Sequence, residues 1–219
     1  MSYEIGRVQS EFLTNYQIRA CHKLAINALA EKLSERRTRA EVEAFVGPLG
    51  TYMLRTRNPN RAVGRRYRSG QVFFNVRTVL TTDTNNRVIG CLHSASNVSG
   101  SPIERKAKLS TRPDKIYHWV SGISVDPSHW GQGIATRMML KSLEGVDDRR
   151  SVTAYPSPSE DPEFVHKLIS LGFVVPEPAY GVADLYGPGS EPATQIRLVA
   201  PVPELRANLE ARSRFGHNP

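Results

Sequence analysis

Hydrophobic and polar residues recur along this chain with two different periods, and the changes between them outline its elements. A period of about 3.6 residues predicts helices over residues 11–33 with Ser10 as N-cap, 39–46, 134–145, 162–171 and 203–213. Runs rich in β-branched and aromatic residues predict strands at 3–8, 71–82, 87–96, 117–125, 151–155, 173–175 and 195–199. Residues 83–86 predict a turn that joins two of these strands into a hairpin. The polar segments 55–70 and 97–114 predict loops.

This order of elements predicts an α/β (α+β) fold with a mixed central sheet flanked by helices, rather than a regular β-α-β repeat. Without a repeat or a second core, residues 1–219 are expected to form one domain, with an arginine-rich insertion at 36–70 and a C-terminal helix and tail at 203–219. No apolar run approaches the roughly 20 residues that cross a bilayer, and the first residues lack a signal-peptide pattern. Cys21 and Cys91 fit neither a disulfide framework nor a metal site. These features predict a cytoplasmic protein that has no contact with membranes.

The net charge of +8 and the pI near 9.7 favour anionic partners. Much of the excess lies in one segment, as Arg36, Arg37, Arg39, Arg55, Arg57, Arg61, Arg65, Arg66 and Arg68. This segment is either a contact surface for an anion such as RNA or an acidic peptide, or a solvated loop. Tyr52 and Tyr67 are interleaved with the arginines, which weakly supports a platform for stacking bases. Both interpretations stay open.

The stretch from Tyr117 to Leu143 carries the clearest chemical pattern. A buried strand ends at Asp126-Pro127, a glycine turn follows, and a helix begins at Ile134. Such an arrangement aims free backbone N–H groups and the positive end of a helix dipole at one point, which suits a pyrophosphate. Gly131 and Gly133 keep side chains out of that space. The stretch therefore predicts an anion site.

The string V-x-P-x-x-W-G-Q-G-I-A from Val125 to Ala135 resembles the acetyl-coenzyme A binding motif of the GNAT superfamily of N-acetyltransferases. The core of that motif, Gln/Arg-x-x-Gly-x-Gly/Ala, falls on Trp130, Gly133 and Ala135, with tryptophan in place of the usual first residue. Residues 164–173 resemble the second signature of the family, a helix that ends in Leu-Gly-Phe. The order of the predicted elements agrees with the family fold.

The resemblance implies direct acetyl transfer from acetyl-coenzyme A to a primary amine. It also implies that strands 117–125 and 151–155 splay apart, with the pantetheine arm in the gap. The implied cofactor-binding residues are Ile123, Ser124, Val125, Trp130, Gly131, Gln132, Gly133, Ile134, Ala135 and Thr136. The family also suggests a homodimer, by analogy alone.

The residues for acid–base chemistry follow less directly from the resemblance. Many family members carry a glutamate at the position of Ser121, and His118 on the same strand is an alternative base or a packed histidine. Residues three apart face opposite sides of a regular strand, so a bulge is needed to bring them together. The usual tyrosine acid is replaced by Leu168, and Tyr155 is the candidate substitute. Further candidates are His93 and Glu160 as bases and Ser157 as an acid.

Three hypotheses about function follow. The first is an N-acetyltransferase. The second is a non-catalytic module that binds acyl-coenzyme A, because Ser121 and Leu168 occupy the two usual acid–base positions. The third is an RNA-associated protein, either an acetyltransferase or a binder, that uses the arginine-rich segment.

Overall fold

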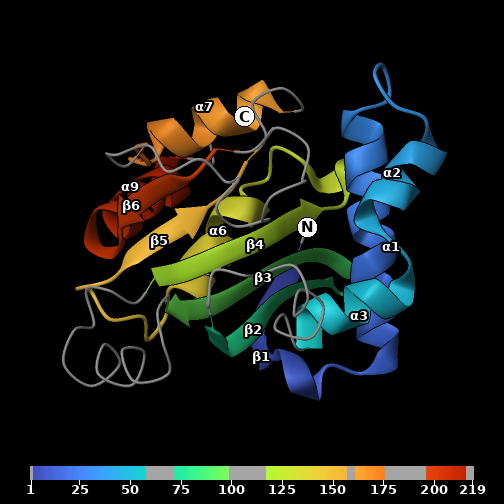
Figure 1. The fold of residues 1–219 in the computed structure, drawn as a ribbon, viewed down its shortest axis with the longest axis horizontal. Coiled ribbons are helices and arrows are strands. Elements are labelled where there is room, and N and C mark those ends of the chain that lie inside the picture. Colours follow the sequence, from blue (N-terminus) through green and yellow to red (C-terminus); the bar gives the residue numbers. More distant parts are fainter. Residues whose placement is uncertain (1, 58–71, 99–116, 157–160, 176–195, 216–219) are drawn as a thin grey trace.

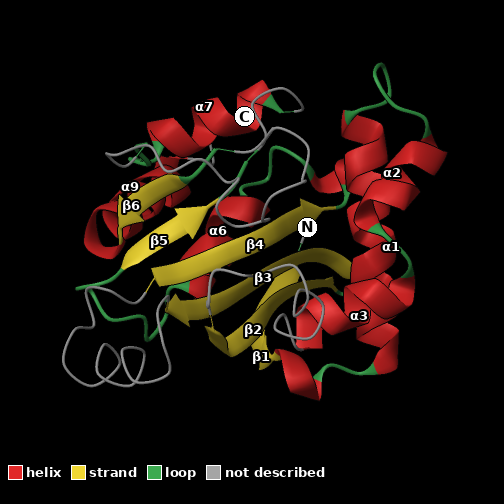
Figure 2. Ribbon diagram, viewed as in Figure 1, coloured by secondary structure: helices red, strands yellow, loops and turns green. Residues whose placement is uncertain are grey.

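A mixed six-stranded sheet forms the centre of the protein (Figures 1 and 2). The computed structural model describes residues 2–57, 72–98, 117–156, 161–175 and 196–215. The strands follow one another across the sheet in chain order, as β1 (Tyr3–Gln9), β2 (Val72–Asp83), β3 (Val88–Val98), β4 (Tyr117–Val125), β5 (Ser151–Ala154) and β6 (Leu198–Pro201). All neighbours are antiparallel except β4 and β5, which are parallel. The predicted mixed α/β fold is confirmed.

Helices cover both faces of the sheet and enclose two cores. Val79 and Leu80 are adjacent on β2, so their side chains point to opposite faces, and each belongs to a different core. The core around Leu80 packs against α1 (Asn15–Lys32), α2 (Arg39–Val46) and α3 (Leu49–Arg57). The core around Val79 packs against α6 (Ile134–Ser142), α7 (Pro162–Ser170) and α9 (Val202–Phe215). No helix in the described ranges is long and apolar enough to span a membrane.

The strands β4 and β5 stay together over only a short distance. Tyr117, His118 and Trp119 pair with Ser151, Val152 and Thr153, and no pairing follows. The six residues of β4 beyond Trp119 therefore face a gap on the β5 side within the described part of the chain. The splay of the central strands that the resemblance implies is present.

Several predicted boundaries need correction. The first long helix is capped by Thr14, whose side chain accepts a hydrogen bond from the Gln17 N–H at 3.1 Å while Gln17 bonds back to the Thr14 N–H. Ser10 is buried in a short 3-10 turn, η1 (Ser10–Phe12), and its hydroxyl lies 2.9 Å from that of Thr78. The loop expected from residue 55 is wrong at its start, because α3 continues to Arg57. Near 173–175, only Val174 forms a bridge, to Val199.

Candidate functional site

The free edge of β4 presents backbone groups to the gap. The Asp126 N–H donates to the carbonyl of Ile89 on β3 at 2.8 Å. Because hydrogen-bonding directions alternate along a strand, the N–H and C=O groups of Ile123 and Val125 point the other way, toward the gap. The Val125 carbonyl already accepts a bond from Trp130 Nε1 at 2.9 Å. The remaining groups on this edge are suitable for pairing with an extended ligand.

A β-bulge opens the surface beside this edge. His93 pairs with Gly122 and Ser94 with Val120, so Ser121 is the extra residue on β4. Ser121 and Gly122 are exposed although they lie mid-strand in the centre of a sheet. A Cβ placed on Gly122 would meet no atom within 4 Å, and Ser121 Oγ donates to the His93 carbonyl at 3.2 Å. The bulge therefore provides open space next to the gap.

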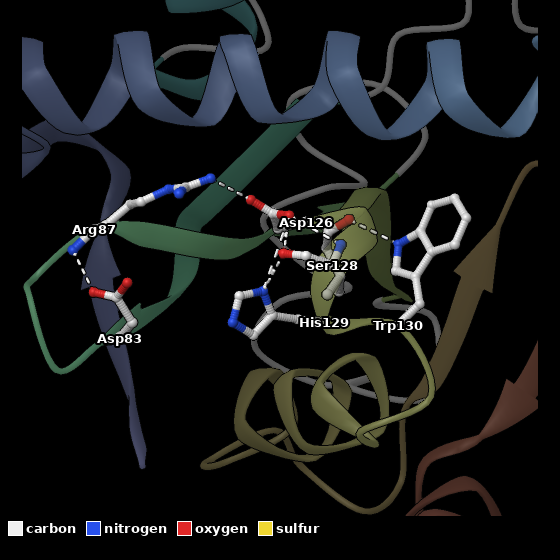
Figure 3. Close-up of polar contacts among 7 residues, drawn as sticks. Asp83, Arg87, Asp126, Ser128, His129 and Trp130 are labelled. Atoms are coloured by element: carbon white, nitrogen blue, oxygen red, sulfur yellow. Dashed lines mark hydrogen bonds and ion pairs between the residues drawn. The ribbon is translucent and has the colours of Figure 1, made fainter. Parts of the chain in front are cut away.

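The end of β4 is held by a cluster of polar contacts around Asp126 (Figure 3). Its carboxylate accepts bonds from the Ser128 N–H at 3.1 Å and hydroxyl at 2.6 Å, and forms an ion pair with Arg87 at 2.6 Å. Partial burial raises the pKa of Asp126, but the bonds from Ser128 and the Arg87 charge outweigh it and lower the pKa overall. The charged carboxylate fixes the direction of the chain through η3 (Pro127–His129) into the next turn.

The glycine turn leads to a helix whose first N–H groups are free. Gly131 and Gly133 adopt φ values of +79° and +71°, which side chains rarely tolerate. Gly133 caps α6 without a side chain, whereas Thr14, Thr38 and Asp161 cap α1, α2 and α7. Within the described residues, the N–H groups from Gly131 to Thr136 find no acceptor, and the first helical bond is Arg137 N–H to Gly133 O at 3.1 Å. These donors fit a pyrophosphate.

Arg137, which belongs to no recognised motif in the sequence, adds positive charge to this turn. Its guanidinium donates to the Gln132 carbonyl and lies 4.8 Å from the ring centre of Tyr3. A single arginine in a first helical turn gives no distinct signal in a sequence. Its position beside the turn depends on the fold, which brings the Gln132 carbonyl within reach of the guanidinium.

Comparison with known proteins agrees with this geometry. The sequence model of the acetyltransferase (GNAT) family matches residues 39–155, about half of the chain. The chain belongs to the GNAT family. It is therefore an acyltransferase with acetyl-coenzyme A as its donor substrate. No curated protein matches it in sequence.

Solved structures share the GNAT fold at low identity. PaiA N-acetyltransferase from Thermoplasma acidophilum, solved with coenzyme A, is 10% identical, with 92% of this chain and 99% of that chain covered and a TM-score of 0.53. Diaminobutyrate acetyltransferase from Paenibacillus lautus is 13% identical, with coverages of 92% and 96% and a TM-score of 0.48. The first of these shows that the whole described architecture is that of the family.

In this GNAT member, His118 and Ser121 do not meet. His118 is 1% exposed and lies in register with Ser96, on the α6 face of the sheet, whereas Ser121 is exposed at the bulge. Burial, and then the charges of Arg77, Arg150 and Arg7, lower the pKa of His118 to about 3. Its imidazole is therefore neutral near pH 7 and is a weak base.

The other acid–base candidates have different surroundings. Tyr155 directly follows β5, on the far side of the gap, and is half-buried. Leu168 is 1% exposed within the core, so its position supplies no acid. His93 is half-buried, with Nε2 2.7 Å from the Tyr52 hydroxyl and Nδ1 3.0 Å from the Thr78 hydroxyl. Ser157 and Glu160 lie outside the described residues.

Proposed function

We propose that this GNAT protein transfers the acetyl group of acetyl-coenzyme A to a primary amine that approaches over Ser121 and Gly122. The observation that carries the proposal is that pairing of β4 with β5 ends at Trp119, next to the exposed bulge and the uncapped start of α6. Donor edge, open surface and anion cradle thus lie along one continuous stretch of chain, from Val120 to Thr136.

In this proposal, backbone groups hold the donor. The N–H and C=O groups of Ile123 and the N–H of Val125 pair with the pantetheine, and the half-buried Ser124 lies between them. The N–H groups from Gly131 to Thr136 hold the pyrophosphate. Trp130 is 46% exposed and its indole N–H is bonded to Val125, so it offers the donor an apolar ring in place of the usual polar side chain. Bound acetyl-coenzyme A supplies an activated thioester at the bulge.

An attacking amine has a pKa of about 10.4 and must first lose a proton. We assign this proton to His93, which lies in register with the exposed Gly122. The Tyr52 hydroxyl passes its own proton to His93 Nε2 and is reprotonated from the amine through water. Both ring nitrogens of His93 face hydroxyl groups, and a hydroxyl either donates or accepts. Neutral and protonated His93 are therefore both fully hydrogen-bonded, which suits a group that gains and loses a proton.

Two further residues complete the proposed chemistry. Ser121 donates to the His93 carbonyl and so holds the bulge open. As the C–N bond forms and the C–S bond breaks, Tyr155 donates a proton to the departing thiolate from the β5 side. A thiol with a pKa of about 8.5 leaves with little help, so the leucine at position 168 does not prevent turnover.

The test is release of coenzyme A, measured with a thiol reagent, on addition of a panel of amines that includes polyamines, amino acids and lysine peptides.

Gly133→Glu should abolish acetyl-coenzyme A binding in calorimetry, because the new side chain fills and charges the cradle. Gly145→Glu is the matched control, because Gly145 also has a positive φ, +69°, and has open space around it. Unchanged donor affinity in folded Gly133→Glu would overturn the donor site. Donor binding without turnover of any amine would favour the non-catalytic alternative.

The same assay tests His93. We expect His93→Gln to lower kcat near pH 7 by about 10²- to 10⁴-fold, because glutamine keeps a hydrogen bond to Tyr52 but takes up no proton. Acetyl-coenzyme A affinity should stay unchanged. His166→Gln on the exposed face of α7 is the control, with native turnover expected. Full activity of His93→Gln would remove His93 from the mechanism.

A further inference from the structure

We propose a second anion-binding site, which binds a phosphate group, at the C-terminal end of α6. Three arginines from distant parts of the chain surround it: Arg7 on β1, Arg77 on β2, and Arg150 just before β5. Arg7 and Arg77 both donate to the carbonyl of Glu144, the latter at 3.3 Å. Arg150 Nη1 donates to Ser96 Oγ, also at 3.3 Å.

Strand register places the three side chains on one face. Arg7 pairs with Val79, and Arg77 precedes Val79 by two residues, so both point to the α6 side of the sheet. Arg77 pairs with Ser94, and Ser96 pairs with His118, which extends this polar surface across β3 and β4. Ser94 Oγ and His118 Nε2 are buried there without a hydrogen-bond partner in the described residues. Buried polar atoms normally have hydrogen-bond partners. This polar surface therefore offers Ser94 Oγ and His118 Nε2 for contacts that the described residues do not make.

The positive charge of this cluster is only partly balanced, since the charge of Arg150 helps to lower the pKa of Asp147 without forming an ion pair with it. Within the described residues, none of the three arginines forms an ion pair with a carboxylate. The nearby carboxylates are occupied, since Glu144 pairs with Lys141 at 2.9 Å and Asp147 with Arg149 at 2.8 Å. Burial, followed by the charges of Arg7 and Arg150, lowers the pKa of Arg77. A bound anion would relieve this repulsion.

Capping of α6 explains only part of the cluster. Two guanidiniums on the carbonyl of Glu144, one residue past the C-cap of α6, are a favourable arrangement at the negative end of a helix dipole. Arg150, however, bonds to Ser96 on β3 and leaves its buried Nε without a partner among the described residues. The charge of Arg150 acts on Arg77 in the same cluster, but Arg150 forms no bond with the end of α6 in the described residues.

The chemistry of the three side chains selects the ligand. A guanidinium presents a planar fork that matches pairs of oxygens, and three forks exceed what the two oxygens of a carboxylate accept. A phosphate dianion has enough oxygens and charge. The nine residues of α6 separate this site from the glycine turn by about 14 Å, so it is distinct from the pyrophosphate cradle.

The test is titration of the full-length protein with inorganic phosphate at constant ionic strength in a chloride buffer, followed by calorimetry. We expect saturable binding that Arg77→Gln and Arg150→Gln each weaken about tenfold or more, since each removes a charge-assisted contact. Arg39→Gln, which removes an exposed arginine of α2 that is paired with Glu43, should bind phosphate like the wild type. Gly133→Glu should also keep phosphate binding, which separates this site from the donor cradle.

A phosphate monoester in a second titration distinguishes a free ion from a phosphorylated small molecule. Tighter binding of the monoester than of phosphate, lost in the same two variants, assigns the site to a phosphorylated small molecule. Equal affinities assign it to the free ion. The proposal is overturned if phosphate binds no better than chloride, or if Gly133→Glu alone abolishes binding. It is also overturned if the arginine variants lower the melting temperature by the same amount with and without phosphate, because the cluster then serves only to cap α6.

Discussion

At the scale of single residues, His118 shows which properties of a side chain the local sequence predicts and which it does not. The pattern correctly put a histidine on the strand beside the glycine turn, and strand periodicity indicated that residues 118 and 121 face opposite sides. The low pKa of His118 comes first from burial and then from the charges of Arg77, Arg150 and Arg7, which lie far from it in sequence. Only the register of five strands brings these charges to the imidazole, so its low pKa was beyond local reasoning.

This low pKa predicts how stability changes with pH. The pKa of His118 falls from its ordinary 6.5 to about 3 on folding. Between these values the unfolded chain binds a proton that the folded chain does not, so stability is lost as the pH falls through this window. The loss is about 1.4 kcal/mol per pH unit. Urea unfolding in chloride buffer should show this slope between about pH 6 and pH 4 for the wild type relative to His118→Gln. Parallel curves for the two proteins would contradict it.

At the scale of elements, a boundary was predictable where the sequence contains residues that clearly stop a strand or begin a helix. The bounds of β4 were predicted correctly, because Asp126-Pro127 stops a strongly β-forming run. The start of α1 was not, because Ser10 and Thr14 are both suitable caps and only the partner of each hydroxyl separates them. The bulge at Ser121 depends on pairing with His93 and Ser94, so the sequence of β4 alone could not locate it.

The arginine-rich segment illustrates the same limit. Its described part forms α2 and α3, where Arg39 pairs with Glu43 at 3.0 Å and Arg57 donates to the Leu13 carbonyl at 2.7 Å. Arg61, Arg65, Arg66 and Arg68 lie outside the described residues. The local contacts explain some of these arginines as structural, and binding of RNA by the segment stays a prediction.

Close packing of α6 on the sheet predicts a coupling between stability and donor binding. A Cβ on Gly90 of β3 would lie 3.0 Å from Met138 Sδ and 3.2 Å from Thr81 Cβ, so α6 sits close only because the residue is glycine. Gly90→Val should lower the free energy of unfolding by about 1–3 kcal/mol and weaken acetyl-coenzyme A binding, because a displaced α6 carries the cradle with it. Calorimetry and urea unfolding measure both effects. Gly6→Val on β1, with no atom within 4 Å of a Cβ, is the control. Native donor affinity in Gly90→Val would show that the cradle tolerates movement of α6.

At the scale of the whole molecule, the sheet consists of two parts, β1 to β4 and β5 with β6, that are connected by a short stretch of pairing between β4 and β5. The strands β1 to β4 pair extensively, whereas in the described part of the chain three residue pairs between β4 and β5 join β5 and β6 to them. The sequence predicted this architecture through the family resemblance, since a splayed pair of strands has no local signature. A donor that fills the gap would restore the missing strand neighbour, so its binding should tie the two parts together.

Hydrogen exchange at single amides tests this. The amides of Ile123 and Val125 face the gap, whereas the Asp126 amide is bonded to Ile89 at 2.8 Å and is the internal reference. Donor at about 100 times its Kd stabilises the fold by about 2.7 kcal/mol, which slows every amide that exchanges through global unfolding. Pairing with pantetheine should slow Ile123 and Val125 beyond this common effect when exchange is followed by NMR. If they slow no more than Asp126 does, the donor does not pair with β4, and the splay has another function.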